Sequence, residues 1–425
     1  MDNKVCVKKP NKLNENEDFE KYTKEELIEK MKSITAHNQQ LKNIIAKSSL
    51  SKEQRQQNNL KPFNFSKCTV KHIALKLYYL GWEHKGYVVQ EDTTDTIEHY
   101  LFEALLRTRL IKDRQSSNYH RCGRTDKGVS SFGQVISIDV RSALPKGADD
   151  LTKEINYCKI LNKVLPSSIQ CIAWSPVDES FSARFDCKTR SYKYYFPKGS
   201  LDIERMKVAS EKLLGVHDFR NLCKMDVGNG VTEFTRNILK ISIEKRSKDD
   251  LENDYTIYVI NIKAKAFLWH QIRCIMGILF LIGQRKEEPD VIDELLNVEK
   301  NPRKPEYSMA SEIPLNLYFC EYDGLNWQYD KEVLDQIIEK LNSIWTFHAI
   351  KSEMVKDMVA SLETDRKTLS IDCNKEEKCL STNLFQKPSS KIYIPLMKRH
   401  TCDSLEDKIK HFTKRKRIEI VTKAK

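Results

Sequence analysis

Alternating apolar and polar positions predict strands throughout the middle of the chain. In residues 72–82, HIALKLYYLGW, the apolar side chains Ile73, Leu75 and Leu77 recur at every second position, which is typical of a strand with one buried face. Gly81 ends this strand. The same alternation predicts five further strands, within residues 133–142, 165–177, 189–197, 237–246 and 254–267.

Helical periodicity predicts the elements between these strands. Ile97, Leu101 and Leu105 share one face of residues 93–111, as the buried side of an amphipathic helix does. A second helix is predicted over residues 267–283 and includes the run IMGILFLIG, which is far shorter than the ~20 apolar residues of a membrane span. A third helix is predicted over residues 205–215, with Gly215 at its end.

The order of these elements predicts an α+β fold. Strand, helix, glycine-rich loop and strand are followed by a second set of strands with its own long buried helix. We expect two similar antiparallel sheet-plus-helix halves, residues 67–200 and 201–325, which form a central cleft. No convincing sequence repeat relates the two halves.

A polar extension precedes this core. Residues 1–66 are rich in Lys, Asn, Gln and Glu, which argues against a packed core, and one amphipathic helix interrupts them. Thr23 and Glu26 form a capping-box pattern at its start. A helix that pairs with a partner and a solvated free helix are both compatible with its heptad spacing, which is set by Leu27, Ile34 and Leu41.

A second polar extension, residues 326–425, follows the core. Residues 363–391 are predicted to be a flexible loop, and residues 403–420 recover helical periodicity. Asp403 or Ser404 can cap that helix. Leu405, Ile409 and Phe412 form one apolar stripe, and a second face carries the cations Lys410, Lys414 and Arg417.

Composition limits the classes of function. The 425 residues carry a net charge of +12, which a general excess of lysine or a nucleic-acid partner would explain equally well. Twelve cysteines are scattered from Cys6 to Cys402 without any C-x-x-C spacing, which favours reduced thiols and no zinc site. No phosphate-binding loop or dinucleotide-binding fingerprint is present either.

The segment HRCGRTDKGVSSFGQV, residues 120–135, carries the clearest candidate chemistry. Its single carboxylate, Asp126, lies among Arg121, Arg124 and Lys127 on a glycine-rich backbone. Asp126 could be a structural acid, or a group that acts on an anionic substrate. A metal-ligand role is disfavoured because no second carboxylate or histidine lies at ligand spacing. The glycines would let a polynucleotide backbone come close.

This segment also resembles a known family. GRTDKGV, followed by FGQVISIDV, is similar to the G-R-T-D-x-G-V motif of the TruA family of pseudouridine synthases. The order and spacing of the motifs agree over residues 72–322. Two longer stretches, 119–142 and 304–322, resemble the eukaryotic branch that modifies positions 38 and 39 of the tRNA anticodon stem-loop. Further similar motifs are ARFDCKTRSYKYY at 183–195, AFLWHQIRCIMGIL at 266–279 and PLNLYF at 314–319.

The resemblance implies an isomerase that converts uridine to pseudouridine. The reaction would cleave the N-glycosidic bond with the help of an aspartate, rotate the base and rejoin it through C5 to C1′, without any cofactor. The catalytic residues would be Asp126 as nucleophile, Tyr192 and Arg273. Substrate contacts would come from Tyr192, Arg124, Arg121, Lys127 and His270.

Three of these roles can be weighed against simpler ones. Tyr192 would stack on the flipped base, but it could also be a core aromatic of its strand. Arg124 would fill the gap that the flipped base leaves, or would only contact phosphate. Arg273 matches the arginine that pairs with the aspartate. An arginine in so apolar a helix is costly to bury unpaired, so we expect a buried acid, Asp126, as its partner.

The expected partners follow from the same resemblance. They are tRNA and a second copy of the chain in a homodimer, with no membrane, metal or nucleotide cofactor, in the nucleus and cytoplasm. Three other functions remain open on the sequence: a synthase of the same family that acts on other uridines, a catalytically silent tRNA-binding protein, and a basic coiled-coil adaptor. The last would leave the glycine-rich loop unexplained.

Overall fold

The computed structural model describes residues 23, 31, 63–145, 150–246, 255–368 and 392–416. Contacts divide the chain into two units, Met1–Asn64 and Phe65–Lys425, and the account below concerns the second unit. The predicted N-terminal helix therefore lies outside the described residues, apart from Thr23 and Met31.

Most of the predicted strands and helices are present. The strands are β1 Thr69–Tyr79, β2 His120–Arg121, β3 Ser130–Ser142, β4 Ile169–Pro176, β5 Thr189–Pro197, β6 Gly215–Asp218, β7 Thr235–Lys245, β8 Ile257–Ala264 and β9 Leu315–Glu321. The α-helices are α2 Ile97–Arg107, α3 Tyr157–Asn162, α4 Ile203–Glu211, α5 Gln271–Gly283, α6 Val291–Leu296, α7 Lys331–Thr368 and α8 Leu405–Lys416.

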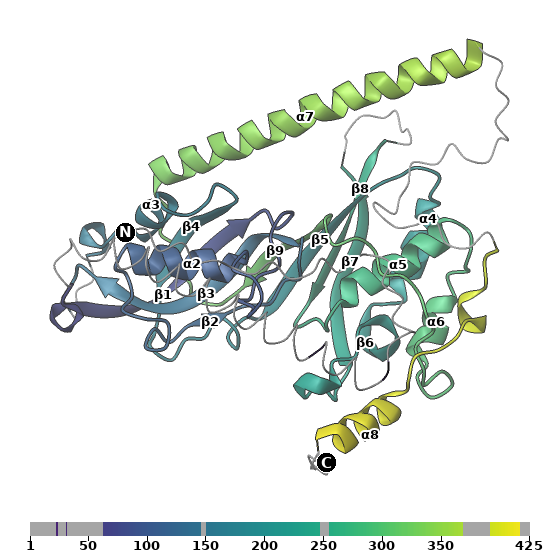
Figure 1. Cartoon of the computed structure of the whole chain (residues 1–425), viewed down its shortest axis with the longest axis horizontal. Helices are drawn as coiled ribbons and strands as arrows, with labels where there is room; N and C mark the ends of the chain where they lie inside the picture. The colour runs from purple at the N-terminus through teal and green to yellow at the C-terminus, as the bar shows by residue number, and fades with distance from the viewer. Residues whose placement is uncertain are drawn as a thin grey trace. The chain divides into compact units, whose positions relative to one another are not determined.

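Within the described residues, nine strands form a single sheet (Figure 1). The strand order is β4-β1-β3-β9-β5-β8-β7-β6, and the short β2 pairs with β3. β3 and β9 pair in parallel where Ser130 lies opposite Asn316, and the other pairings are antiparallel. The fold is thus α+β with a mostly antiparallel sheet. The two sets of strands expected from the sequence belong to one sheet, which β9 makes continuous.

Two apolar clusters pack against this sheet. One joins β1, β3 and β4 to α2 and α3, and α2 contributes its predicted stripe, Ile97, Leu101 and Leu105. The other joins β5, β7 and β8 to α4, α5 and α6. The run of apolar residues in α5 is explained by burial on all sides, since nearly every side chain from Gln271 to Gly283 is buried.

The third predicted helix is only partly correct. α4 ends at Glu211, and Gly215 begins β6 instead of ending the helix. Gly215 has a φ of +92°, which lets the chain leave the helix direction and enter the sheet. β6 then pairs with β7, with Gly215 opposite Ile238.

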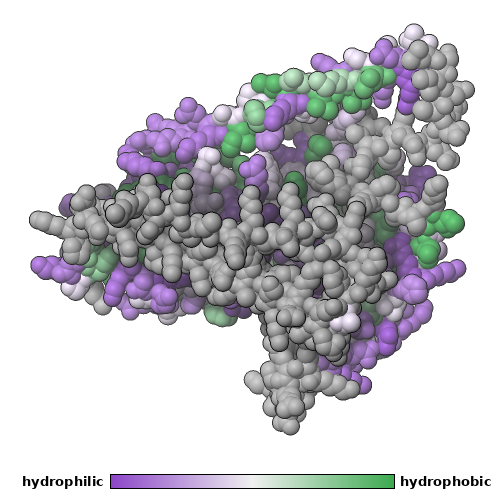
Figure 2. Space-filling view, in the orientation of Figure 1, coloured by the Kyte–Doolittle hydropathy of each residue, from purple (hydrophilic) through white to green (hydrophobic). Residues whose placement is uncertain are grey.

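α7 was not predicted, because its polar composition does not show a strong amphipathic stripe. The flexible loop predicted over residues 363–391 is wrong for its first part, since residues 363–368 belong to this helix. Its first turns are anchored by Val333 and Ile337, which are buried against the cluster of β1. Contact with the body continues as far as His348, whose ring packs edge-on against Trp82 with 5.3 Å between the ring centres. Figure 2 shows apolar side chains exposed among polar ones along the helix. Trp345, for example, is 71% exposed. None of the described helices combines the length and apolar character that a membrane crossing requires.

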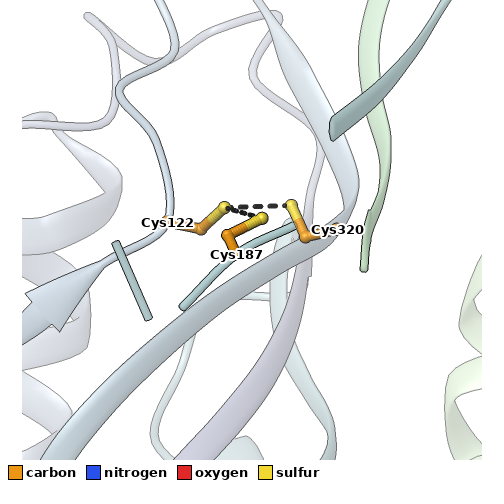
Figure 3. Close-up of side chains that lie close together, drawn as sticks. All are labelled: Cys122, Cys187 and Cys320. Carbon is orange, nitrogen blue, oxygen red and sulfur yellow. Dashed lines mark hydrogen bonds between the residues drawn. The ribbon is translucent and has the colours of Figure 1, made fainter. Parts of the chain in front are cut away.

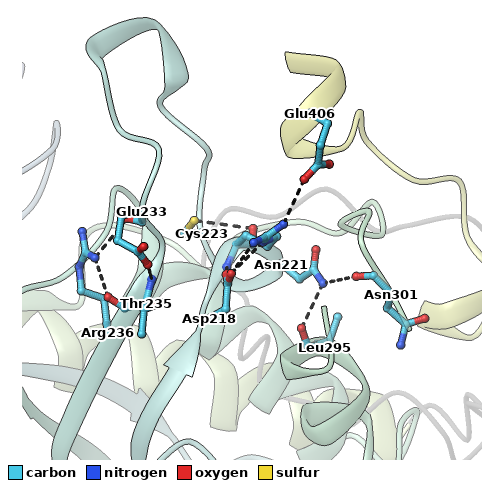
Figure 4. A network of polar contacts seen from close by, with 10 residues as sticks. Asp218, Asn221, Cys223, Glu233, Thr235, Arg236, Leu295, Asn301 and Glu406 are labelled. Carbon is cyan, nitrogen blue, oxygen red and sulfur yellow. Dashed lines mark hydrogen bonds and ion pairs between the residues drawn. The ribbon is translucent and has the colours of Figure 1, made fainter. Parts of the chain in front are cut away.

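α8 follows the prediction closely. Ser404 caps it, and its Oγ accepts a hydrogen bond of 3.1 Å from the backbone N–H of Asp407. Leu405 is buried and Ile409 packs against the second apolar cluster. Glu406 lies 3.7 Å from Arg220, in the polar network that surrounds Asp218 and Asn221 (Figure 4). The predicted Arg417 and the side chains of Phe412 and Lys414 lie outside what the structure describes.

Candidate active site

The glycine-rich loop between β2 and β3 is held by backbone hydrogen bonds on both sides of Asp126. The N–H of Tyr87 donates to the carbonyl of Thr125 over 3.1 Å, and the N–H of Gly128 donates to the carbonyl of His84 over 3.2 Å. Within the loop, the N–H of Val129 donates to the carbonyl of Asp126 itself. The backbone of Asp126 is therefore fixed by partners on either side.

Buried side chains hold the start of the same loop. The hydroxyl of Tyr79, at the end of β1, lies 2.7 Å from Oγ1 of Thr125. Burial raises the pKa of Tyr79 well above its usual range, so the Tyr79 hydroxyl stays protonated at neutral pH. Gln134 donates from Nε2 to the carbonyl of Gly123 over 2.9 Å. A Cβ on Gly81 would lie 2.0 Å from the carbonyl oxygen of Val129, so only glycine fits where β1 passes the loop.

The carboxylate of Asp126 contacts two residues that precede α5. Oδ1 accepts a hydrogen bond of 3.2 Å from the indole nitrogen of Trp269, and Oδ2 lies 3.3 Å from Nε2 of His270. His270 has a φ of +58°, a left-handed conformation that costs a non-glycine residue about 1 kcal/mol. Its Nδ1 is buried without a hydrogen-bond partner among the described residues. The predicted substrate contact His270 thus contacts the catalytic candidate directly.

Asp126 lines a pocket of about 570 Å³. Tyr192 on β5 also lines it, and its ring packs edge-on against Phe267 with 5.1 Å between the ring centres. Burial raises the pKa of Tyr192 well above its usual value, so it is a neutral phenol at physiological pH. The pocket brings Asp126, Tyr192 and Arg273 together, although these residues are far apart in the sequence.

The predicted ion pair between Arg273 and Asp126 is wrong in this structure. Arg273 donates from Nη2 to Oε2 of Glu312 over 2.8 Å and from Nε to the carbonyl of Ala310 over 2.8 Å. The packing of α5 explains why Arg273 pairs with Glu312 and not with Asp126. At Gly277 the helix comes so close to the segment before β9 that a Cβ would lie 2.6 Å from the Ser308 carbonyl oxygen.

Glu312 also connects Arg273 to the glycine-rich loop. A Cβ on Gly128 would lie 2.6 Å from Cγ of Glu312, so the acid packs directly on the loop backbone. Gly128 has a φ of +80°, which favours glycine there in any case. Arg273 is therefore connected to Asp126 indirectly. It binds Glu312, and Glu312 packs on the loop that carries Asp126.

The predicted basic contacts divide into two kinds. Arg124 and Lys127 are exposed, line the pocket and have no ion-pair partner among the described residues. Arg121 instead donates from Nη1 to Oε1 of Glu98 over 2.7 Å, and the Glu98 side chain is fully buried. Arg121 lines a neighbouring pocket of about 300 Å³, but its guanidinium already compensates a buried carboxylate.

Comparison with known proteins decides the family. A family model described as tRNA pseudouridine synthase matches residues 209–323. A tRNA pseudouridine(38/39) synthase of Bos taurus is 46% identical over 387 residues, which cover 84% of this chain and 80% of that protein. The protein of the same name from Homo sapiens is 43% identical over 433 residues, covering 95% of this chain and 90% of the relative. The one from Saccharomyces cerevisiae is 41% identical and covers 63% and 61%.

The chain belongs to the tRNA pseudouridine synthase family.

Sequence reasoning missed several residues in the pocket of this synthase. Trp269 contacts Asp126, but nothing in the segment AFLWHQIRCIMGIL marked it as a site residue. Lys224 lies with Nζ 4.2 Å from the centre of the Trp269 ring, a cation–π contact that only the fold creates. Arg184 lines both pockets, and its place in the motif ARFDCKTRSYKYY could have suggested it. Outside the pocket, Glu312 could have been found as the acid three residues before β9.

Proposed function

We propose that this synthase isomerises uridine to pseudouridine at positions 38 and 39 of the tRNA anticodon stem-loop. The observation that carries the proposal is Asp126, whose carboxylate is oriented by Trp269 and His270 in a pocket large enough for a nucleoside. The positions come from the relatives, which are named tRNA pseudouridine(38/39) synthases.

The chemistry needs a carboxylate beside the ribose. The bond between N1 of uracil and C1′ breaks, the base turns, and a bond forms from C5 to C1′; C5 then loses its proton and N1 gains one. Positive charge develops at C1′ as the first bond breaks, as it does in glycoside cleavage. Asp126 can add to the sugar, or it can stabilise this charge while the C2′ proton is removed. Substrate and product are isomers, so the balance needs no further reactant.

Tyr192 supports the base in this scheme. A base that is cleaved at C1′ has to leave the helical stack, and an aromatic ring in the pocket can stack on it while it is detached. Because the Tyr192 hydroxyl has a raised pKa, it is protonated and suits hydrogen-bond donation better than proton abstraction. Its side chain lies among apolar residues that include Phe267. These neighbours would shield the detached base from water while Tyr192 stacks on it.

The cations of the pocket suit an RNA substrate. Arg124 and Lys127 flank Asp126 in the loop and are exposed, and Lys224 and Arg184 line the same pocket. Contacts from such side chains to phosphates position an RNA, whereas the choice of uridine depends on the shape of the stem-loop. Arg124, as the neighbour of Thr125 and Asp126, is placed to fill the gap that the flipped base leaves.

Anticodon stem-loop transcripts test the proposal. One transcript carries uridine at positions 38 and 39, and two control transcripts carry cytidine at one or the other position. We expect pseudouridine at each uridine present at these positions, read at single-nucleotide resolution. Whole tRNA is tested in parallel, and modification only at other positions of it would indicate another branch of the family. Tight binding without any turnover would indicate a silent tRNA-binding protein.

We also propose that the enzyme acts as a homodimer. The net charge of +12 per chain would let two chains together form the long basic surface that binding a tRNA needs. Light scattering of the active enzyme at micromolar concentration should give the mass of two chains. A fully active species with the mass of one chain would contradict this part of the proposal.

A further inference from the structure

Three cysteines from distant parts of the sequence meet beside the active-site loop (Figure 3). Cys122 follows β2, Cys187 precedes β5 and Cys320 lies in β9. Sγ of Cys122 is 3.4 Å from Sγ of Cys187 and 3.3 Å from Sγ of Cys320, and the three sulfurs all lie within 4.8 Å of one another. All three side chains are buried, and none is in a disulfide.

The distances distinguish between two uses of such a cluster. A disulfide needs two sulfurs at about 2.05 Å, much closer than any pair here. Zinc–sulfur bonds of about 2.3 Å at tetrahedral angles place ligand sulfurs about 3.8 Å apart. The observed 3.3–3.4 Å separations would need an expansion of only about 0.4 Å to reach this. A disulfide also joins only two sulfurs, whereas three converge here.

A cation lies beside the three cysteines. Arg190 is fixed near the cluster because its Nη2 donates to the carbonyl of Cys122 over 3.0 Å. Three thiolates and one divalent cation carry a net charge of −1, which the guanidinium of Arg190 would offset.

A fourth ligand has a route to the cluster. Cys122 lines the pocket of about 300 Å³ that also contains Gly123, Arg124 and Arg184. A water molecule in this pocket would lie next to Cys122. Three thiolates and one water complete a tetrahedral set for a thiophilic ion.

We propose that Cys122, Cys187 and Cys320 bind one zinc ion. The thiol protons that binding displaces go to solvent. The ion would connect the start of the glycine-rich loop, the entry to β5 and the end of β9. Cys122 is four residues from Asp126, and Cys187 is five residues from Tyr192. The ion takes no part in the isomerisation, because none of the three cysteines lines the 570 Å³ pocket.

Metal binding by the reduced, untagged full-length protein tests this proposal. Zinc is titrated against a chromophoric chelator, and Co²⁺ is added in a parallel experiment to detect thiolate-to-metal charge transfer. We expect one zinc ion per chain and a charge-transfer band with cobalt. Cys187→Ala and Cys320→Ala should lower the zinc affinity at least about 10-fold and abolish the band. Cys158→Ala is the matched control, since Cys158 is equally buried in another cluster, and it should bind zinc like the wild type.

Thermal unfolding keeps the test decisive if a cysteine variant folds poorly. Zinc at about 100 times its dissociation constant should raise the melting temperature of the wild type, and removal of zinc by a chelator should reverse the rise. The proposal is wrong if the reduced wild type binds neither zinc nor cobalt. It is also wrong if Cys187→Ala and Cys320→Ala retain the cobalt band, or if mild oxidation with glutathione disulfide joins two of the three cysteines in a chain that takes up no metal.

Discussion

Each carboxylate oxygen of Asp126 has one nitrogen neighbour, the indole of Trp269 on one side and the imidazole of His270 on the other. Both neighbours come from the turn that begins α5, where His270 adopts a left-handed backbone conformation. Such strain is tolerated where the surrounding structure fixes it, and here it brings the imidazole to the acid. The side chain that the chemistry needs is thus held in one orientation by two contacts.

Asp126→Asn keeps this shape and removes the charge. We expect turnover to fall at least about 1,000-fold, because a carboxylate that participates covalently or electrostatically contributes several kcal/mol to the transition state. The affinity for tRNA should stay within a few-fold, since no cation is lost. Asp323→Asn, in an exposed acid paired with Lys188, is the control and should leave both quantities unchanged. Single-turnover rates and filter binding measure them, and more than a tenth of wild-type turnover in the Asp126→Asn enzyme would exclude the proposed role.

The pair of Arg273 and Glu312 gives a second prediction at this scale. Arg273→Leu leaves Glu312 unpaired in a partly buried position, and we expect a loss of about 1–3 kcal/mol in the free energy of unfolding, because the acid keeps some contact with water. Arg273→Lys should lose less in both stability and turnover. In the double variant with Glu312→Leu, urea denaturation should show that part of the loss is recovered. Strictly additive losses would mean that the two side chains do not interact.

At the scale of elements, the glycine-rich loop depends on close backbone contact with the end of β1. Gly81 faces the carbonyl of Val129, and Tyr79 holds Thr125 by its hydroxyl. The strand and the loop therefore form one unit, and an added side chain in the contact must displace one of them.

Gly81→Ala tests this contact. Its Cβ would lie 2.0 Å from the Val129 carbonyl oxygen, so we expect overpacking of about 1–3 kcal/mol and a lower turnover number at unchanged tRNA affinity. Gly123→Ala is the matched control for stability, because its Cβ would meet no atom within 4 Å. Denaturation curves compare the two variants. Equal stability of both would show that the β1 contact does not constrain the loop.

α8 gives a prediction about RNA binding. The buried Leu405 and the ion pair of 2.8 Å between Arg303 and Asp407 attach the helix to the body. Lys410, Lys414 and Arg417 share one face of the helix that the sequence predicts over residues 403–420. Replacing all three with glutamine should weaken tRNA binding and reduce its salt dependence by about two or three released ions. Turnover at saturating tRNA should not change. An unaltered salt slope would limit the role of α8 to packing.

How much the sequence could predict depended on whether a feature was local. The stripe of α2 was readable because burial on one face imposes a period on neighbouring residues. The alternation in β1 located the strand, but the expectation of one buried face was wrong, since every residue from His72 to Tyr79 except Lys76 is buried. The family motif located Asp126 and Tyr192. By contrast, the partner of Arg273 depended on which acid the close packing of α5 at Gly277 brings near, and no local pattern contains that information.

At the scale of the whole molecule, β9 accounts for most of what the sequence could not show. It follows the second set of strands along the chain, but it lies between β3 and β5 and joins both sets in one sheet. This placement brings Glu312 onto the loop of Asp126 and Cys320 next to Cys122. The absence of a C-x-x-C spacing therefore did not exclude a cluster of thiols, since its members come from three separate elements.

The most direct test of the central claim is a map of pseudouridine in unmodified tRNA after incubation with the enzyme. Wild-type protein and Asp126→Asn are compared at single-nucleotide resolution and at equal bound fractions of tRNA. We predict new pseudouridine at positions 38 and 39 with the wild type and none above background with Asp126→Asn. Equal modification by both proteins, or none by a wild type that binds tRNA, would contradict the account.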